Sequence, residues 1–227
     1  MPRDRPDEHR GHAEATGLAV RNRVTPTGDV VDIPLRGAWT GNRGILHDGT
    51  DVVRFHRGPL WIICALSFRD WRLPQWSKGH FTVLFFHDEA VALAAGHRPC
   101  ALCRRGSYNA FRAAWAEGQG IGVPPARVVD RQLHQERLYP NTHRRRLHLS
   151  SWPRVPVGAF VLADDQPALV LPDAIVPWSY RGYEPTRSRP RKGPVDVITP
   201  PSTMAALAAG YRPQIDVGAW SQQMMGA

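Results

Sequence analysis

Short apolar runs separated by turn residues fill two stretches of this chain, and segments with helical periodicity lie between and after them. The first stretch covers residues 20–86, and the second begins after Ser150. Runs of this length, bounded by Gly, Pro, Asn and Asp, are typical of β-strands. They predict strands at residues 30–35, 52–55, 60–66, 81–86, 157–162, 168–171, 175–178 and 195–199.

Four segments have the pattern of helices. They are residues 89–95, 107–117 and 127–138, and a last segment that Ser202 or Thr203 caps and that ends at Ala209. Asp88 is placed to cap the first helix, and Gly96 is placed to end it. Gly41-Asn42-Arg43-Gly44, between two predicted strands, predicts a tight turn.

This mixture of elements predicts an α+β protein with two modules. Residues 1–16 are polar and charged without periodicity, so we expect a disordered arm there. Residues 17–140 form a strand–helix module, and residues 150–227 form a mostly β module that ends in a short helix. Within the second module, residues 181–194 (RGYEPTRSRPRKGP) predict a basic, proline-rich loop without a core.

One eight-residue segment occurs twice. The sequence from Ala92 to Pro99 (ALAAGHRP) recurs from Ala206 to Pro213 (ALAAGYRP), with a single difference between the copies. Each copy follows a predicted strand and a helix-capping residue, which argues against coincidence in an alanine-rich chain. Only the first copy leads into cysteines.

Composition excludes several classes of protein. The 227 residues are 42% hydrophobic and 22% charged, values that are typical of globular proteins. Three cysteines are too few for a disulfide scaffold. No signal peptide is visible, and the longest apolar run, Leu60–Leu66, is far shorter than the ~20 residues of a membrane helix. We therefore expect a cytoplasmic protein with reduced thiols and no membrane partner.

Cys100-Ala-Leu-Cys103 is the most specific chemical signal in the chain. Two thiolates separated by two residues can bind one Zn²⁺ ion in tetrahedral geometry. A pair of buried thiols is the alternative, and a redox pair would need a thioredoxin-like context that is not visible. We expect a structural zinc ion here.

The segment from Leu84 to Cys103, with its Ala-Leu-Ala-Ala-Gly-His-Arg-Pro-Cys-x-x-Cys sequence, resembles the zinc-binding domain of the Ada methylphosphotriester-repair family. The resemblance implies zinc, a role in DNA repair, and two more cysteine ligands upstream. Cys64 is the upstream cysteine here, and Phe68 stands where the second would fall. In that family one upstream cysteine accepts a methyl group; Cys64 lies in an apolar run, so we do not expect this activity.

A zinc site with three cysteines needs a fourth ligand, which must be a histidine, an acidic residue or water. We take His56 as the candidate, with His47 and His87 as the other nearby histidines; His97 is the poorest because it occupies the aromatic position of the resemblance. As a whole the chain also resembles actinobacterial proteins that share Gly41–Gly44 followed by Leu46-His47. That resemblance implies no activity.

Arginine dominates the charge of the protein. Its 29 basic residues, of which only Lys78 and Lys192 are lysines, exceed 20 acidic ones for a net charge of +9. Arginine binds phosphate well, although a GC-rich genome would produce the same excess. Clustering favours nucleic acid as partner, with DNA preferred over RNA. The predicted contacts are Arg104, Arg105, Arg144, Arg145, Arg146, Arg187, Arg189 and Arg191.

These features predict a zinc-containing nucleic-acid-binding protein in DNA repair or maintenance. The alternative is an enzyme, a hydrolase or lyase on nucleic acid or a small anionic substrate, with Asp130, His134 and Glu136 as acid–base groups. Asp130 and His134 stand four residues apart and would face each other on a helix. A solvated helix face is the simpler explanation of that cluster, and a protein-interaction scaffold is a third possibility.

Overall fold

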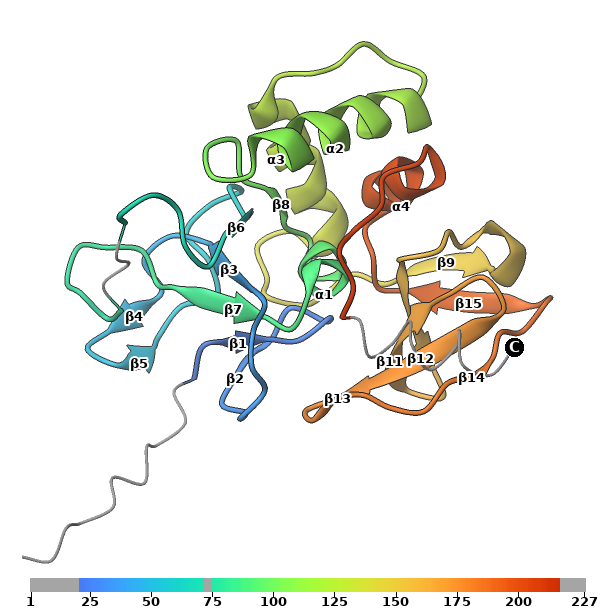
Figure 1. The fold of residues 1–227 in the computed structure, drawn as a ribbon, viewed down its shortest axis with the longest axis horizontal. Helices are drawn as coiled ribbons and strands as arrows, with labels where there is room; N and C mark the ends of the chain where they lie inside the picture. The colour runs from blue at the N-terminus through green and yellow to red at the C-terminus, as the bar shows by residue number, and fades with distance from the viewer. Residues whose placement is uncertain (1–20, 72–74, 217–227) are drawn as a thin grey trace, which may run out of the picture.

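The computed structural model describes residues 21–71 and 75–216. Within these ranges four α-helices pack with two larger β-sheets and a two-stranded ribbon, which confirms the mixed α+β class (Figure 1). The arm expected at residues 1–16 lies outside the described residues. In the ranges that the structure describes, no helix has the length and apolar character needed to span a bilayer.

The first sheet is built from the N-terminal half of the chain. Its six described strands run in the order β2 (Val30–Val31), β1 (Arg23–Val24), β7 (Leu84–Phe86), β3 (Trp39–Asn42), β6 (Ile62–Cys64) and β8 (Arg98–Pro99). The pairs β1–β7 and β6–β8 are parallel, and the other neighbours are antiparallel. Strands β4 (His47–Asp48) and β5 (Asp51–Val52) form the separate ribbon.

The second sheet begins after residue 147 and is antiparallel throughout its described pairs. Its order is β13 (Gly182–Tyr183), β12 (Ala174–Ser179), β11 (Gln166–Val170), β10 (Phe160–Ala163), β15 (Pro194–Val197) and β9 (His148–Ser151). Strand β14 (Arg187–Ser188) also pairs with β12, and a 3₁₀ turn (Trp152–Arg154) follows β9. One hydrophobic cluster includes Val24 of the first sheet and Val197 of the second, so the two sheets share a core.

Helix α1 (Glu89–Ala94) lies between the two sheets (Figure 1). Every residue of α1 is buried, and the Asp88 side chain caps it by accepting a hydrogen bond from the Val91 amide at 2.9 Å, as the sequence predicts. Leu93 packs into the cluster shared by the two sheets, and Val91 packs into a second cluster with Phe160. The helix is therefore part of both hydrophobic cores.

Three further helices form a layer of their own (Figure 1). They are α2 (Arg105–Gly118), α3 (Ala126–Arg137) and α4 (Pro201–Ala208). The ends of α2 and α3 lie within two residues of the prediction. The predicted cap of α4 is wrong, because Ser202 and Thr203 lie inside the helix and Pro200 is its N-cap. Helices α2 and α4 pack closely, since a side chain at Gly118 would meet the Ala205 carbonyl carbon and oxygen at 2.6 and 2.3 Å. Phe111 and Trp115 of α2 are fully buried in the shared core.

Two local predictions differ from the structure. Gly41 belongs to strand β3 rather than to a turn, because only glycine leaves room for the Phe86 ring, which lies 2.2 Å from where a Cβ would stand. The turn residue is Gly44, at φ +96°. The segment 181–194 is also more ordered than a coreless loop: it contains β13 and β14, and Arg189 donates to carbonyl groups inside the fold.

The internal repeat encodes the same helix ending twice. After α1, the Gly96 amide donates to the Leu93 carbonyl at 2.9 Å and the His97 amide to the Ala92 carbonyl at 3.0 Å. After α4, the amides of Gly210 and Tyr211 repeat this pattern at 3.1 and 3.0 Å. Both glycines have positive φ, +88° and +100°, which favours glycine at this position of a helix C-cap.

The repeat supplies a matched test of packing. We expect both Gly96→Ala and Gly210→Ala to lose about 1 kcal/mol for the left-handed backbone. Gly96→Ala should lose about 1–3 kcal/mol more, because its Cβ would stand 2.6 Å from Cδ of Arg137, whereas nothing lies within 4 Å at Gly210. Urea unfolding measures both, and equal losses would contradict this packing.

Candidate metal centre

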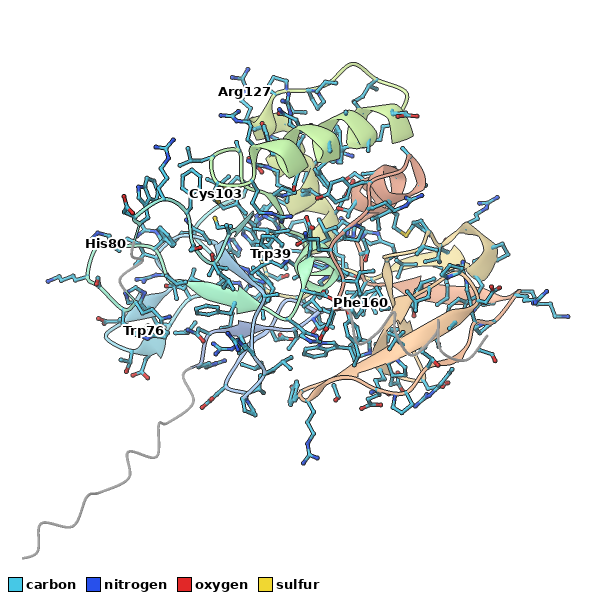
Figure 2. The ribbon with its side chains drawn as sticks, in the orientation of Figure 1. Trp39, Trp76, His80, Cys103, Arg127 and Phe160 are labelled. Atoms are coloured by element: carbon cyan, nitrogen blue, oxygen red, sulfur yellow. The ribbon has the colours of Figure 1, made fainter. Side chains whose placement is uncertain are left out.

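The fold brings the three cysteines together. Cys64 ends β6, Cys100 follows β8, and Cys103 precedes α2. Figure 2 shows Cys103 close to the first sheet. Parallel pairing of β6 with β8 brings Cys64 and Cys100 together, and the Cys100 amide donates to the Ile63 carbonyl at 2.9 Å. The three sulfur atoms all lie within 4.8 Å of one another, close enough to hold a metal ion.

The surroundings of the sulfurs favour one thiolate, at Cys100, whereas burial raises the pKa of Cys103. The Ala65 amide donates to Sγ of Cys103, and the Leu102 amide donates to Sγ of Cys100, each at 3.4 Å. A hydrogen bond from the Cys64 thiol lowers the pKa of Cys100 to about 5 and raises the pKa of Cys64 itself. Thiolates are the form that binds metal, so a cation would displace the remaining protons.

The structure does not bring His56 to the thiols. Its ring lies 5.8 Å from the Trp61 ring and 4.9 Å from the His134 ring, and its Nδ1 accepts from the Gly58 amide. Among the described residues, no histidine or carboxylate joins the three cysteines. The cysteines could therefore supply three ligands, and a tetrahedral ion would take its fourth from water or an external group.

The proposed acid–base residues have separate partners. Asp130 is buried and forms a two-pronged ion pair with Arg98, at 2.7 and 2.8 Å. Nδ1 of His134 instead receives a hydrogen bond from Arg137 at 2.9 Å. Glu136 accepts from the amide and hydroxyl of Ser202, at 3.0 and 2.6 Å. Asp130 therefore does not orient the His134 ring, because the buried Arg98 guanidinium occupies both of its oxygens.

Three of the predicted phosphate-binding arginines serve the fold instead. Arg104 is buried, pairs with Glu89 at 2.9 Å and lies over the Trp39 ring. Arg145 donates to the carbonyls of Ala94, Ala95 and Ile198. Arg189 donates to the carbonyls of Leu171, Trp152 and Val155. Such contacts use the hydrogen-bonding groups that a phosphate would need.

The other five arginines keep more access to solvent. Arg105, Arg144 and Arg191 are exposed. Arg146 is half-buried and donates to the Gln135 carbonyl, and Arg187 is exposed with Asp164 3.6 Å away. Of the eight arginines that the sequence predicts to contact phosphate, these five therefore remain candidates.

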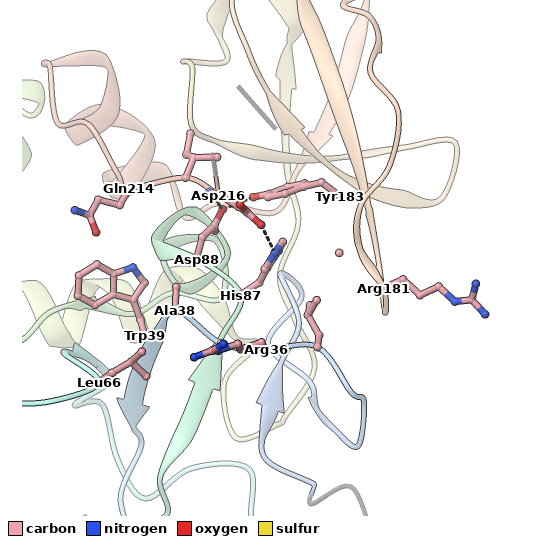
Figure 3. A pocket seen from close by; sticks show the side chains of 14 residues that line it. Arg36, Ala38, Trp39, Leu66, His87, Asp88, Arg181, Tyr183, Gln214 and Asp216 are labelled. Atoms are coloured by element: carbon pink, nitrogen blue, oxygen red, sulfur yellow. Dashed lines mark hydrogen bonds and ion pairs between the residues drawn. The ribbon is translucent and has the colours of Figure 1, made fainter. Parts of the chain in front are cut away.

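A cavity of about 820 Å³ between the two sheets was not anticipated from the sequence (Figure 3). In it, Nε2 of His87 lies 2.8 Å from Asp216, and Nδ1 of His87 receives a hydrogen bond from Trp178. The Tyr183 hydroxyl donates to Asp88 at 2.7 Å. Both ring nitrogens of His87 therefore have partners. The bonds of His87 to Asp216 and of Tyr183 to Asp88 connect later parts of the chain to the residues just before α1. The sequence pointed to two residues of this site for other reasons, to Asp88 as a helix cap and to His87 as a possible zinc ligand.

Comparisons with known proteins do not extend this picture: no family model, curated protein or solved structure matches the chain. The similarity of residues 84–103 to the Ada zinc-binding domain therefore remains an expectation. The function has to be inferred from the residues themselves.

Removing the Asp130 carboxylate should destabilise the protein strongly. We expect Asp130→Asn to cost about 3–5 kcal/mol in unfolding free energy, because the Arg98 cation would be left buried without its partner. His134→Ala should cost about 1 kcal/mol or less, since Arg137 keeps its carbonyl partners. Chemical denaturation compares the two variants, and a greater loss for His134→Ala would contradict this assignment.

Proposed function

We propose that this chain is a zinc-containing nucleic-acid-binding protein that acts in DNA repair or maintenance. The observation that carries the proposal is the convergence of three cysteine sulfurs within 4.8 Å, from two segments that are distant in sequence. Zn²⁺ favours thiolate ligands, and structural zinc sites in proteins commonly contain three or four of them. Cys64, Cys100 and Cys103 would hold the ion.

Zinc at this place would add a link between elements that already share a hydrophobic core. It would connect the end of β6 to the turn that begins α2, and so fix the position of that helix on the first sheet. Metal binding at such a site contributes directly to folding free energy. We assign the ion this structural role. Its fourth ligand would be water or an external group, and such an open position is otherwise typical of catalytic zinc sites.

Exposed arginines and the overall charge support nucleic acid as the partner. Arg105 begins α2 two residues after Cys103, so zinc would also hold this guanidinium in place. Arg144 and Arg191 are exposed on other segments, and the chain has a net charge of +9. Guanidinium groups that neutralise phosphates release counterions, which makes such binding strongly dependent on salt.

Metal analysis tests the zinc centre. Purified protein should contain one zinc ion per chain, and Cys100→Ser should lower both the zinc content and the thermal midpoint, because it removes the buried central ligand. A chelator should lower the midpoint of the wild type and leave that of Cys100→Ser nearly unchanged. A wild-type protein that is fully folded without metal, and that gains no stability from added zinc, would contradict the proposal.

Salt-dependent binding tests the partner. For labelled single- and double-stranded DNA, we expect Arg105→Ala to weaken binding and to reduce the salt slope by about 1, the effect of one lost phosphate contact. Lys78→Ala, which removes the same charge from an exposed loop outside the predicted clusters, is the control. Binding that ignores salt, or that responds equally to both variants, would exclude a specific role for Arg105.

A further inference from the structure

A cluster of cations surrounds Trp61, away from the cysteines. The Trp61 side chain is 1% exposed, and the guanidinium carbons of Arg43 and Arg137 lie over its ring at 3.9 and 3.7 Å from the centroid. Arg43 and Arg137 are 0% and 1% exposed. His97, also fully buried, lies 5.0 Å from the same ring and receives a hydrogen bond from Arg43 at 3.1 Å.

Within the described residues these cations form no direct ion pair, although the carboxylate of Asp29 attracts Arg43 and Arg145, and that of Asp130 attracts Arg137, from farther away. Arg43 donates to the Gly28 carbonyl at 2.8 Å, and Arg137 donates to the carbonyls of Gly96 and Pro59 at 2.7 and 2.8 Å. Arg145, nearby, also donates to carbonyls. In the described part of the chain, none of the three arginines forms an ion pair. Carbonyl dipoles neutralise a buried charge only in part, so the positive potential persists.

The cluster also has more donors than acceptors. Among the described residues, half of the buried side-chain nitrogen and oxygen atoms that lack a hydrogen-bond partner belong to it: Nη2 of Arg43, Nε of Arg137, Nε of Arg145 and Nδ1 of His97. Nδ1 of His97 carries the proton because Nε2 accepts from Arg43. All four atoms are therefore N–H donors. These atoms are inaccessible to solvent, so they act on the face above them through positive potential and not through direct hydrogen bonds to a ligand.

Three histidines lie over this cluster on its more exposed side. His56 and His134 are half-buried with their rings 4.9 Å apart, and His143 is exposed with its ring 5.8 Å from that of His56. Nδ1 of His56 accepts from the Gly58 amide, and Nδ1 of His134 accepts from Arg137. In a neutral ring the proton then resides on Nε2, so both histidines offer another N–H donor.

Burial and the neighbouring cations favour the neutral form of the His56 and His134 rings. Burial, followed by His134 and Arg137, lowers the pKa of His56 to about 4. Burial and Arg137 lower the pKa of His134 as well. The exposed Arg144, next to His143, adds a permanent positive charge at the edge of the face.

We propose that the face formed by His56, His134 and His143 above Arg137 binds a phosphate group. A phosphate offers acceptor oxygens for the Nε2–H groups of His56 and His134, and negative charge for the arginines beneath them, which form no direct ion pair with any described residue. The group could be the phosphate of a nucleic acid or free inorganic phosphate. If the phosphate belongs to a nucleic acid, the inference rests on the proposed function. If it is free inorganic phosphate, it does not.

Titration with inorganic phosphate tests the site. The zinc-loaded full chain is titrated at constant ionic strength, balanced with chloride, while imidazole nitrogen resonances and heat are recorded. We expect the resonances of His56 and His143 to shift while those of the exposed His80 do not. His56→Phe, which keeps an aromatic ring but loses the donor, should weaken binding about tenfold, and His56→Gln, which keeps a donor, should weaken it less.

Two results would overturn the phosphate site. One is the absence of shifts at His56 and His143 on titration with phosphate. The other is equal affinity of His56→Phe and wild type. His143→Ala provides a second variant that should fold normally, since its side chain is exposed and has no hydrogen bond within the described residues. It too should weaken phosphate binding, and His80→Ala should not.

Oligonucleotides distinguish the source of the phosphate. If His143→Ala weakens binding of single-stranded DNA together with binding of inorganic phosphate, the ligand is a nucleic-acid phosphate. Comparing strands with and without a 5′-phosphate then separates terminal from internal groups. If only inorganic phosphate binding weakens, the site is a free-phosphate site. In that case the proposal stands, and the nucleic-acid function is judged separately by the Arg105 variant.

Discussion

The fold depends on satisfying the two ends of one buried helix. No residue of α1 reaches solvent, so its terminal amides and carbonyls need partners from the protein itself. Acidic groups lie at its N-terminus and guanidinium groups at its C-terminus, the arrangement that the helix dipole favours. At the first end, Glu89 pairs with Arg104 and accepts from the Tyr211 hydroxyl. At the other, Arg145 donates to the carbonyls of Ala94 and Ala95, and Arg137 donates to the carbonyl of Gly96 just beyond the helix.

These partners connect distant parts of the chain around α1. Tyr211 comes from the segment after α4, and Arg145 from the connection between the helical layer and the second sheet. Gly96, which follows the C-cap residue of α1, turns the chain into β8, and pairing of β8 with β6 then brings Cys100 to Cys64. The candidate metal centre is therefore positioned by the same contacts that satisfy the helix, and the two sheets share one core for the same reason.

The arginine content has a different meaning in the folded protein than in the sequence. A net charge of +9 suggests a basic surface, yet Arg43, Arg98, Arg104 and Arg137 are almost fully buried. They stack on aromatic rings and bind carbonyls or carboxylates, which guanidinium groups can do because they are planar and weakly hydrated. Charge counting records how many cations exist, but only packing decides which of them face solvent.

Local patterns in the sequence determined the four helices, the cap at Asp88, the repeated helix ending and the approximate places of eight strands. Short-range capping and periodicity suffice for these features because neighbouring residues make the contacts. The tertiary structure alone decided that Cys64 meets Cys100 and Cys103, that His56 joins Trp61 instead of the thiols, and that Asp130 pairs with Arg98. Each of these contacts joins residues at least 5 positions apart, and the strand pairing and burial that create them are set by the whole chain.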